Sequence, residues 1–408
     1  MLNIQWIYKF KTPNLKSDRL RAKKMDNSVF IVRCPDYDVV GDKITELIAM
    51  MTGKGSFAAS GEKIVLKVNL LQPAKPEQAL TTHPALVAAV ARLLKTEGAT
   101  PIIADSPGSG YPYTERTLDK FYRTCGMSQA AEEAGIELNL DTAYDTVSYP
   151  AGKLIKRFEV ITPVLEADAV FNLCKLKTHT FMHMSGAVKN IFGVIPGLTK
   201  PVYHFKLRDK ARFAAMLLDL AEYVSPRISI MDAVTALEGE GPGSRGMPRH
   251  VGLLIAARSP LALDVVASEI IGLKREKNQV LIEAENRGLY PNRLEDVEIV
   301  GADIADLRIP DYKLPATAVE GSGFGRFDWL APMFRKRMTL QPRVIKANCI
   351  ACGACRDACP LKAITIVDCK HAQINDDMCI RCYCCHEMCP EGAIKLHRGL
   401  LYRIVNRS

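Results

Sequence analysis

Two evenly spaced cysteine runs near the C-terminal end constrain this 408-residue chain more than any other feature. In each run four cysteines are separated by two, two and three residues, and proline follows the last. The members are Cys349, Cys352, Cys355 and Cys359 in the first run, and Cys379, Cys382, Cys385 and Cys389 in the second. Three thiolates at this spacing can wrap a short loop around three irons of a cubane, while the fourth reaches the other cluster. The spacing therefore predicts two 4Fe-4S clusters, one held by Cys349, Cys352, Cys355 and Cys389 and the other by Cys379, Cys382, Cys385 and Cys359.

Zinc or disulfides are the alternative uses of so many cysteines. A structural zinc takes four ligands, commonly as two pairs, and does not need a third evenly spaced cysteine. Disulfides require an oxidising compartment, which nothing in the sequence indicates. Cys384 adjoins Cys385 but breaks the regular spacing, so we expect Cys385 to be the ligand. Cys384 and Cys369 are expected to be small buried thiols.

The doubled run resembles bacterial-type ferredoxins over about fifty residues. An apolar segment follows each run, Ala363–Ile366 after the first and Ala393–Leu396 after the second, as in that family. The resemblance implies a small α+β domain at residues 344–398, followed by a tail at 399–408.

The composition is that of a globular protein, and the chain is long enough to form a larger domain in addition to this small one. The sequence is 48% hydrophobic and 24% charged, without an apolar run that could span a bilayer or a recognisable signal peptide. We therefore expect a cytoplasmic protein. The formal charge of +9 falls to roughly +5 with two clusters of about −2 each. Basic residues form no aromatic-interleaved stripe, so nucleic acid is not an expected partner.

The remaining chain divides by pattern. Residues 1–24 are strongly basic and are expected to be a disordered tail or to precede the true start at Met25. Residues 25–310 alternate apolar strands with amphipathic helices, which predicts an α/β domain with a mostly parallel sheet covered by helices on both faces. Residues 311–343 are rich in Pro, Gly and aromatics and are expected to form a linker.

Polar residues at predicted strand ends are the first candidates for a binding site, because ligands of parallel sheets bind there. Three such groups are Lys67 with Asn69, Asp105, and Lys175, Lys177 and His179 after a strand ending at Cys174. A fourth is Asp232, which leads towards Glu238. In an extended segment Lys175, Lys177 and His179 would share one face, and the two lysines would repel unless an anion or carboxylate lay between them.

More cations follow this segment. Lys189 and Asn190 lie in a loop that enters a helix, and Lys200 and His204 come soon after. Together these residues predict a site for an anionic ligand such as a carboxylate or phosphate. Two weaker alternatives are a solvated lysine edge and a metal bound by His179 and His183 on one helical face.

Residues 25–300 resemble the domain-of-unknown-function family 362, which is often fused to a two-cluster ferredoxin domain. The resemblance rests on short motifs, chiefly Lys67–Asn69, Thr82–Pro84 with His83, Ala104–Pro107, Lys175–His179, Ser185–Asn190, Gly193 to Gly197, Met231–Ala233 with Glu238, and Asp264. It implies a shared α/β fold and a shared pocket, with no settled reaction.

Three functions fit these features. The first is an oxidoreductase that exchanges electrons with a donor or acceptor protein and acts on an anionic small molecule, with an additional cofactor left open. In it Lys175, Lys177 and Lys189 hold charge, His179 or His204 donates a proton, and Asp232 or Glu238 orients the ligand or a metal. Lys67, Asn69, His83, Asp105 and Asn190 would complete the binding site. The second is a noncatalytic electron-transfer or assembly subunit, and the third is a nonredox, metal-assisted enzyme with structural clusters.

Overall fold

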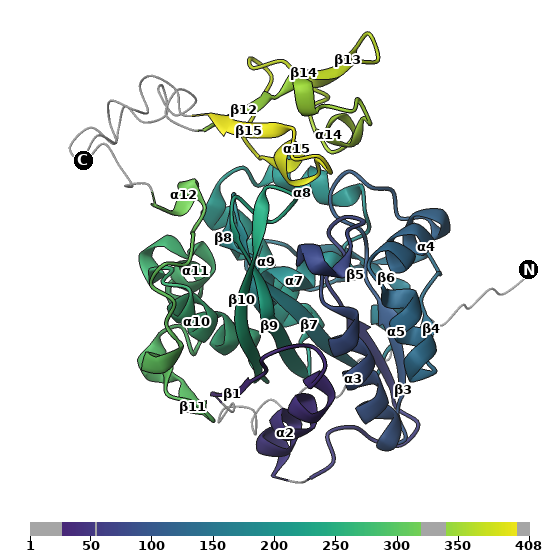
Figure 1. Ribbon diagram of the computed structural model, residues 1–408, viewed down its shortest axis with the longest axis vertical. Coiled ribbons are helices and arrows are strands. Elements are labelled where there is room, and N and C mark those ends of the chain that lie inside the picture. The colour runs from purple at the N-terminus through teal and green to yellow at the C-terminus, as the bar shows by residue number, and fades with distance from the viewer. Residues whose placement is uncertain (1–26, 54, 320–339, 398–408) are drawn as a thin grey trace, which may run out of the picture.

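A computed structural model describes residues 27–53, 55–319 and 340–397 (Figure 1). The basic segment 1–24, most of the expected linker and the tail from 399 lie outside the described residues. Within them the chain forms an α/β domain and a smaller C-terminal module, residues 340–397, that packs against one end of its sheet (Figure 1). The expected fold class is confirmed.

A nine-stranded sheet forms the centre of the α/β domain. Its order is β11-β1-β10-β9-β7-β2-β3-β4, with β8 paired to β7. The bounds are β1 Ser28–Arg33, β2 Lys63–Lys67, β3 Thr100–Ala104, β4 Glu137–Leu138, β7 Ala169–His179, β8 His183–Met184, β9 Ile228–Gly239, β10 Gly246–Ala257 and β11 Glu298–Val300. Most pairs are parallel, but β10 runs antiparallel to both β1 and β9. Strand β8 also pairs antiparallel to β7, so the sheet is mostly parallel with two reversed strands.

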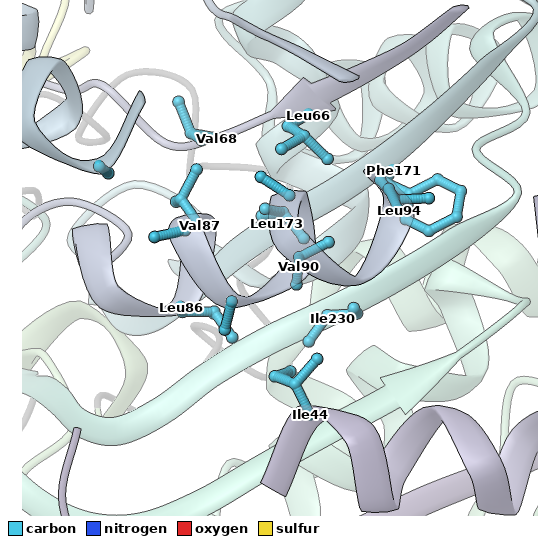
Figure 2. Close-up of a cluster of buried hydrophobic side chains, with 14 of the residues drawn as sticks. Ile44, Leu66, Val68, Leu86, Val87, Val90, Leu94, Phe171, Leu173 and Ile230 are labelled. Atoms are coloured by element: carbon cyan, nitrogen blue, oxygen red, sulfur yellow. The ribbon is translucent and has the colours of Figure 1, made fainter. Parts of the chain in front are cut away.

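Alternating strand residues bury both faces of the sheet. Leu66 and Ile230 pack into one core, while Val65 and Met231, each the neighbour of one of them, pack into cores on the opposite face. This period of two follows from strand geometry. The first core receives helices α2 Val40–Thr52, α3 Pro84–Thr96, α4 Glu115–Thr124 and α5 Met127–Ala134. Figure 2 shows Leu66, Ile230 and Phe171 of the sheet against Val90 of α3 and Ile44 of α2.

The opposite face is covered by later helices. These are α7 Gly186–Asn190, α8 Thr199–Lys206, α9 Lys210–Val224, α10 Pro260–Ile270 and α11 Gln279–Asn286. A peripheral hairpin, β5 Tyr144–Ser148 with β6 Arg157–Ile161, and the short helices α6 Thr162–Glu166 and α12 Ala316–Val319 complete the domain. Helices therefore cover both faces, as the alternating pattern predicts.

Strands β7 and β9 continue farther than the sequence pattern indicates, so one prediction about them is wrong. Lys175, Lys177 and His179 lie inside β7 and Asp232 lies inside β9, instead of following those strands. The extension has two supports: β10 pairs with β9 as far as Gly239, and β8 pairs with the end of β7. The weaker alternative of a metal on one helical face is not supported, because His179 and His183 lie in strands β7 and β8 and pair across a β-bridge.

The C-terminal module consists of two short sheets and two short helices. Strand β12 Gln341–Val344 pairs with β15 Ile394–His397, and β13 Ile364–Val367 pairs with β14 His371–Ile374. Helices α14 Ala354–Asp357 and α15 Cys384–Glu387 each lie within a cysteine run. The apolar segments after the two runs are strands, which confirms that prediction. Figure 1 shows α15 facing the α/β domain near α8.

Candidate functional site

Two cavities in the C-terminal module are each lined by four cysteines. The first is bordered by Cys349, Cys352, Cys355 and Cys389, and the second by Cys359, Cys379, Cys382 and Cys385. In both cavities three cysteines come from one run and the fourth from the other run. The cysteine thiols are thus grouped as the ligation of two 4Fe-4S clusters requires. Aliphatic residues such as Ile364 and Ile394 line the same cavities.

The sulfur environment also suits iron–sulfur clusters. Backbone amides donate to three of these sulfurs, from Ala363 to Cys359 at 3.2 Å, from Ala393 to Cys389 at 3.1 Å and from Ala372 to Cys349 at 3.4 Å. Hydrogen bonds of this kind set cluster potentials. Throughout the described ranges, no group of three or more His, Cys, Asp or Glu side chains is arranged to hold a single metal ion.

The cysteines outside the two quartets differ from one another. Cys384 is fully buried, as expected, and packs with Ala358 and Met388. Cys369 is exposed in the turn between β13 and β14, so its expected burial is wrong. The positive φ of 52° at Cys369 places it in a tight turn, which leaves its side chain outside the module's core.

A buried ion pair lies where β2 and β3 end. Lys67 Nζ is 2.9 Å from Asp105 Oδ1, and both side chains are almost completely buried. Asp105 also accepts hydrogen bonds from the backbone amides of Leu70 and Ser106, both at 2.8 Å. Burial lowers the pKa of Lys67 while Asp105 opposes that shift. Gly193 permits this arrangement, since a Cβ there would lie 2.2 Å from Asp105 Oδ1.

An amide network holds Lys177 beside this pair. Lys177 Nζ donates to Asn69 Oδ1 at 2.6 Å and to Leu80 O at 2.7 Å. Asn69 in turn donates to Asn190 Oδ1 at 2.8 Å, and Asn190 donates to Asn172 Oδ1 at 2.7 Å. Burial and the nearby ammonium groups of Lys189 and Lys175 keep the pKa of Lys177 well below its usual value. Lys177 thus has neutral oxygen partners, and of the two lysines predicted to share an anion or carboxylate only Lys175 pairs with one, that of Asp232.

A small pocket of about 60 Å³ lies next to the network, and Glu387 of the C-terminal module forms part of its lining. Four charged residues line it: Asp105, Lys189, Lys200 and Glu387. Its remaining lining residues include Asn69, Asn190, Ser109, Phe192, Gly193 and His204. Helix α7 supplies Lys189, α8 supplies Lys200 and His204, and α15 supplies Glu387. The pocket therefore lies at the junction of the α/β domain and the cysteine-rich module.

Helix α7 is held in place by Asp264 of α10. Asp264 accepts hydrogen bonds from the backbone amides of Ala187 at 2.5 Å and Val188 at 3.0 Å. Gly186 begins the helix at a positive φ, and a Cβ there would collide with the Asp264 carboxylate at 2.3 Å. Because α7 is only one turn long, these contacts determine where Lys189 and Asn190 lie.

Lys200 is bonded to neutral oxygens only. Its ammonium group donates to Ser106 O at 3.0 Å, Ser106 Oγ at 2.9 Å and Pro107 O at 2.5 Å. Burial lowers the pKa of Lys200 to about 7, with Asp105 opposing the shift and Lys67 and Lys189 adding to it. Lys200 is one of the cations from which the anion site is predicted, and the structure places it in the pocket lining.

His204 is fixed by aromatic side chains. Its ring stacks on Phe213 with centroids 4.5 Å apart and meets the edges of Phe181 and Phe192 at 5.7 and 6.0 Å. Its Nδ1 is buried without a hydrogen-bond partner among the described residues. Burial, together with the charge of Lys189, lowers the pKa of His204 to about 3. The imidazole is therefore neutral at physiological pH and has a free polar edge.

Glu387 is the functional candidate that the sequence analysis missed. Its side chain is buried, and its Oε1 lies 3.4 Å from Nε2 of His179 without a formed hydrogen bond on either atom. Burial raises the pKa of Glu387 to about 7, while Lys189 and Lys177 oppose the shift. Burial and neighbouring cations keep the pKa of His179 well below its usual value. A glutamate two residues after Cys385 carries no sequence signal of its own, because its role depends on how the module docks.

A second polar group lies beside the amide network, around Asp232. Asp232 accepts from Lys175 Nζ at 2.8 Å, from the Tyr37 hydroxyl at 2.9 Å and from the His83 backbone amide at 2.9 Å. The His83 ring stacks on Tyr37 with centroids 3.5 Å apart, and burial lowers its pKa to about 4. The structure thus brings His83, Lys175 and Asp232 together, although none of them lines the pocket.

Glu238 is separate from both groups. Its carboxylate accepts from the Lys313 backbone amide at 3.1 Å and lies 3.5 Å from Lys313 Nζ. It does not line the pocket, because β9 carries it past the sheet edge towards residues 312–313. Glu238 therefore connects β9 to the segment that follows β11.

Close backbone contacts join the C-terminal module to the α/β domain. The imidazole of His386 contacts the Glu240 carbonyl at 3.1 Å, and Arg245 Nη1 donates to Gly392 O at 3.3 Å. A Cβ at Gly243 would lie 2.2 Å from the Glu387 carbonyl, and one at Gly110 would lie 2.6 Å from Ala358 Cβ. Both glycines therefore permit an approach that a larger residue would prevent.

The fold and the cysteine cavities define an α/β protein with a fused cysteine-rich module of the 4Fe-4S type. A family model described as "Domain of unknown function (DUF362)" matches residues 64–269, and one described as "4Fe-4S binding domain" matches residues 342–365 and 372–395. The chain is thus an iron–sulfur protein and belongs to the DUF362 family. This confirms the resemblance drawn from its motifs.

Two known proteins show how far similarity extends. The thylakoid-associated protein sll1697 of Synechocystis is 32% identical over 295 residues, 71% of this chain and 88% of that protein. The apoprotein of the lactate racemase from Thermoanaerobacterium thermosaccharolyticum overlaps 61% of this chain and 58% of that chain, at 14% identity and a TM-score of 0.39. The TM-score of this second comparison is too low to carry an argument. Within the described part of the chain, no helix has both the length and the apolar character needed to cross a membrane.

Proposed function

We propose that this protein is an iron–sulfur oxidoreductase that exchanges electrons with an anionic small molecule bound between its two parts. Two 4Fe-4S clusters would be held by the quartets Cys349, Cys352, Cys355, Cys389 and Cys359, Cys379, Cys382, Cys385. The two four-cysteine cavities and the amide–sulfur hydrogen bonds support this assignment. When bound, such clusters supply one-electron transfer.

The position of Glu387 carries the proposal. It lies on α15, between the cluster-type cysteines Cys385 and Cys389, and it lines the same pocket as Lys189 and His204. One residue thus connects the cysteine-rich module to the polar pocket of the α/β domain. A molecule in this pocket would be close to the cysteine loops, as electron transfer to a small substrate requires.

The chain's residues have distinct roles in this function. Lys189 would attract the anion, and His204 would hydrogen-bond it and exchange a proton through the unpartnered Nδ1. Lys67, Asn69, Asp105, Lys177 and Asn190 form the hydrogen-bonded wall that positions the pocket. His179 would orient Glu387. Lys175, Asp232 and His83 support the neighbouring sheet edge, and Glu238 lies outside the site.

We further propose a cytoplasmic location and a separate protein as electron donor or acceptor. The unpaired thiols of Cys34, Cys125 and Cys174 support a reducing compartment. The exposure of Cys352 supports electron exchange with another protein at that end of the module.

Anaerobic purification of the full chain tests the function. Iron and sulfide analysis should give about eight of each per chain, and mass spectrometry of the released small molecules should identify an anion. The reduced protein should convert that molecule, with loss of the reduced-cluster signal. Cys385→Ser should abolish conversion, whereas the exposed Cys369→Ser should not. Conversion that persists in Cys385→Ser would reject the redox role. An empty pocket together with a stoichiometric protein partner would instead support the electron-transfer or assembly subunit.

A further inference from the structure

The two cysteine runs differ at one position inside their loops. The residue before the second cysteine is Ala351 in the first run and Arg381 in the second, and both have a left-handed backbone, with φ of 55° and 59°. The loops therefore share their backbone conformation at this point, and only the second carries a charged side chain there. Because arginine stays protonated in proteins, this charge is permanent and does not depend on pH.

The Arg381 guanidinium is buried and incompletely bonded. Its side chain is 5% exposed, it lies next to the Cys379 side chain, and its Nη1 is 2.6 Å from Asp376 Oδ1. That carboxylate lies off the N–H directions, because Nε, Nη1 and Nη2 are buried without a hydrogen-bond partner among the described residues. A buried guanidinium carries five N–H groups and normally has acceptors, so the open donors of Arg381 indicate a further acceptor beside Cys379.

The second quartet, which comprises Cys359, Cys379, Cys382 and Cys385, offers such an acceptor. When these thiolates hold a 4Fe-4S cluster, the sulfur atoms beside Arg381 carry negative charge, and reduction adds one more electron. A buried positive charge stabilises the reduced form more than the oxidised form, so it raises the reduction potential. Asp376 offsets only part of this effect, because its side chain is 55% exposed and water screens its charge.

Two smaller contributions favour the first quartet, which comprises Cys349, Cys352, Cys355 and Cys389. Among the described residues, backbone amides donate to two of its sulfurs and to one sulfur of the second quartet. Water near the exposed Cys352 also stabilises added negative charge. Both contributions come from neutral dipoles, and a charged donor forms a hydrogen bond about twice as strong as a neutral one. We therefore expect Arg381 to outweigh them.

We propose that Arg381 sets the order in which the two clusters are reduced, by raising the potential at the second quartet above that at the first. This inference rests on the two clusters of the proposed function and adds a direction to it. Cys352 of the first quartet is exposed, whereas Cys385 of the second lies on α15 together with Glu387, which lines the pocket. One electron thus passes from the cluster at the exposed side, which is oxidised, to the cluster on the pocket side, which is reduced.

Anaerobic redox titration of the iron-loaded full chain with dithionite, followed by absorbance and electron paramagnetic resonance, tests the proposal. Arg381→Gln should lower the potential of the earlier of the two reduction steps and leave the other unchanged. Losing a charge-assisted hydrogen bond changes the reduction equilibrium about 10- to 100-fold, which is about 60–120 mV at 59 mV per tenfold change for one electron. Arg381→Lys keeps the charge and should retain more than half of the native potential difference.

Two further variants control the result. Arg356→Gln removes an arginine of the first run whose side chain is 51% exposed, and it should change either equilibrium by less than about twofold. Cys385→Ala should keep only the four irons of the first quartet, and adding Arg381→Gln to it should leave the remaining potential unchanged.

Three results would overturn the inference: unchanged potentials in an Arg381→Gln protein with eight irons, an equal shift of both steps, or a shift that persists in Cys385→Ala. None of these measurements involves turnover of a small molecule. A native chain without about eight irons would reject the proposed function itself, whereas eight irons with potentials that ignore Arg381 would reject only this inference.

Discussion

Gly243→Ala should loosen the C-terminal module without disturbing its cysteine quartets. The added Cβ would lie 2.2 Å from the Glu387 carbonyl, a backbone atom that cannot rotate away. Ordinary contact begins at 3.4 Å, so α15 and the loop around Gly243 must separate by 3.4 − 2.2 = 1.2 Å. Overpacking of this kind costs about 1–3 kcal/mol, which shifts the docking equilibrium about 5- to 150-fold. Residues 241–245 and 384–388 should therefore lose protection together.

Hydrogen exchange followed by mass spectrometry measures this change. Amides of residues 384–388 should exchange faster in Gly243→Ala, while iron content stays at the native value because no cysteine is altered. Gly41→Ala is the matched control, since no atom lies within 4 Å of its added Cβ, and it should leave α15 unchanged. Native protection of residues 384–388 in an iron-loaded Gly243→Ala protein would refute the close backbone contact and, with it, the place of α15 in the pocket lining.

Three further outcomes follow from other contacts. Lys175→Met should lower the free energy of unfolding by about 3–5 kcal/mol in urea titrations, because Asp232 stays buried without its cation; a loss below about 1 kcal/mol would contradict a buried charge pair. Burial raises the pKa of Asp264 to about 7, so the folded state holds a proton that the unfolded state releases near pH 4. Asp264 therefore stabilises the fold at low pH and loses this contribution as pH rises towards 7. The free energy of unfolding of the native chain minus that of Asp264→Asn should fall between about pH 4 and pH 7, and a rise would contradict the reasoning. Cys384→Ala should keep about eight irons and Cys385→Ala should lose about four, and the reverse result would exchange their assigned roles.

Much of the fold could be predicted from the sequence because its signals are local. Strand and helix periodicity predicts the α/β sheet, and His83-Pro84 marks the start of α3, where His83 caps the helix. The lengths of β7 and β9 could not be predicted in this way. Their ends depend on pairing with β8 and the antiparallel β10, and the residues concerned, such as Lys175 and Asp232, are polar yet buried. In a sequence, a charged residue after an apolar run suggests that the strand has ended. Only the structure shows that such a residue lies inside the strand, paired with a buried partner.

The candidate site was predictable in part for the same reason. Lys67, Asn69, Asp105 and Asn190 were expected near one sheet edge, and the structure brings them into one network. Which cation faces the pocket could not be read from the sequence, because that depends on whether neighbouring oxygens already satisfy the ammonium group, as they do for Lys177. Glu387 was missed because its pocket partners lie about two hundred residues earlier in the chain.

The pairing of β12 with β15 has a consequence for how such a protein could arise. The first and last strands of the C-terminal module are hydrogen-bonded to each other, from Gln341 with His397 to Val344 with Ile394. A unit whose ends meet closes its own sheet and can be joined to a host at a single point without opening either structure. The segment that encodes the module is therefore suited to fusion with another gene as a single unit. In this chain the contact with the host passes close to Gly110 and Gly243, where a side chain would prevent the approach.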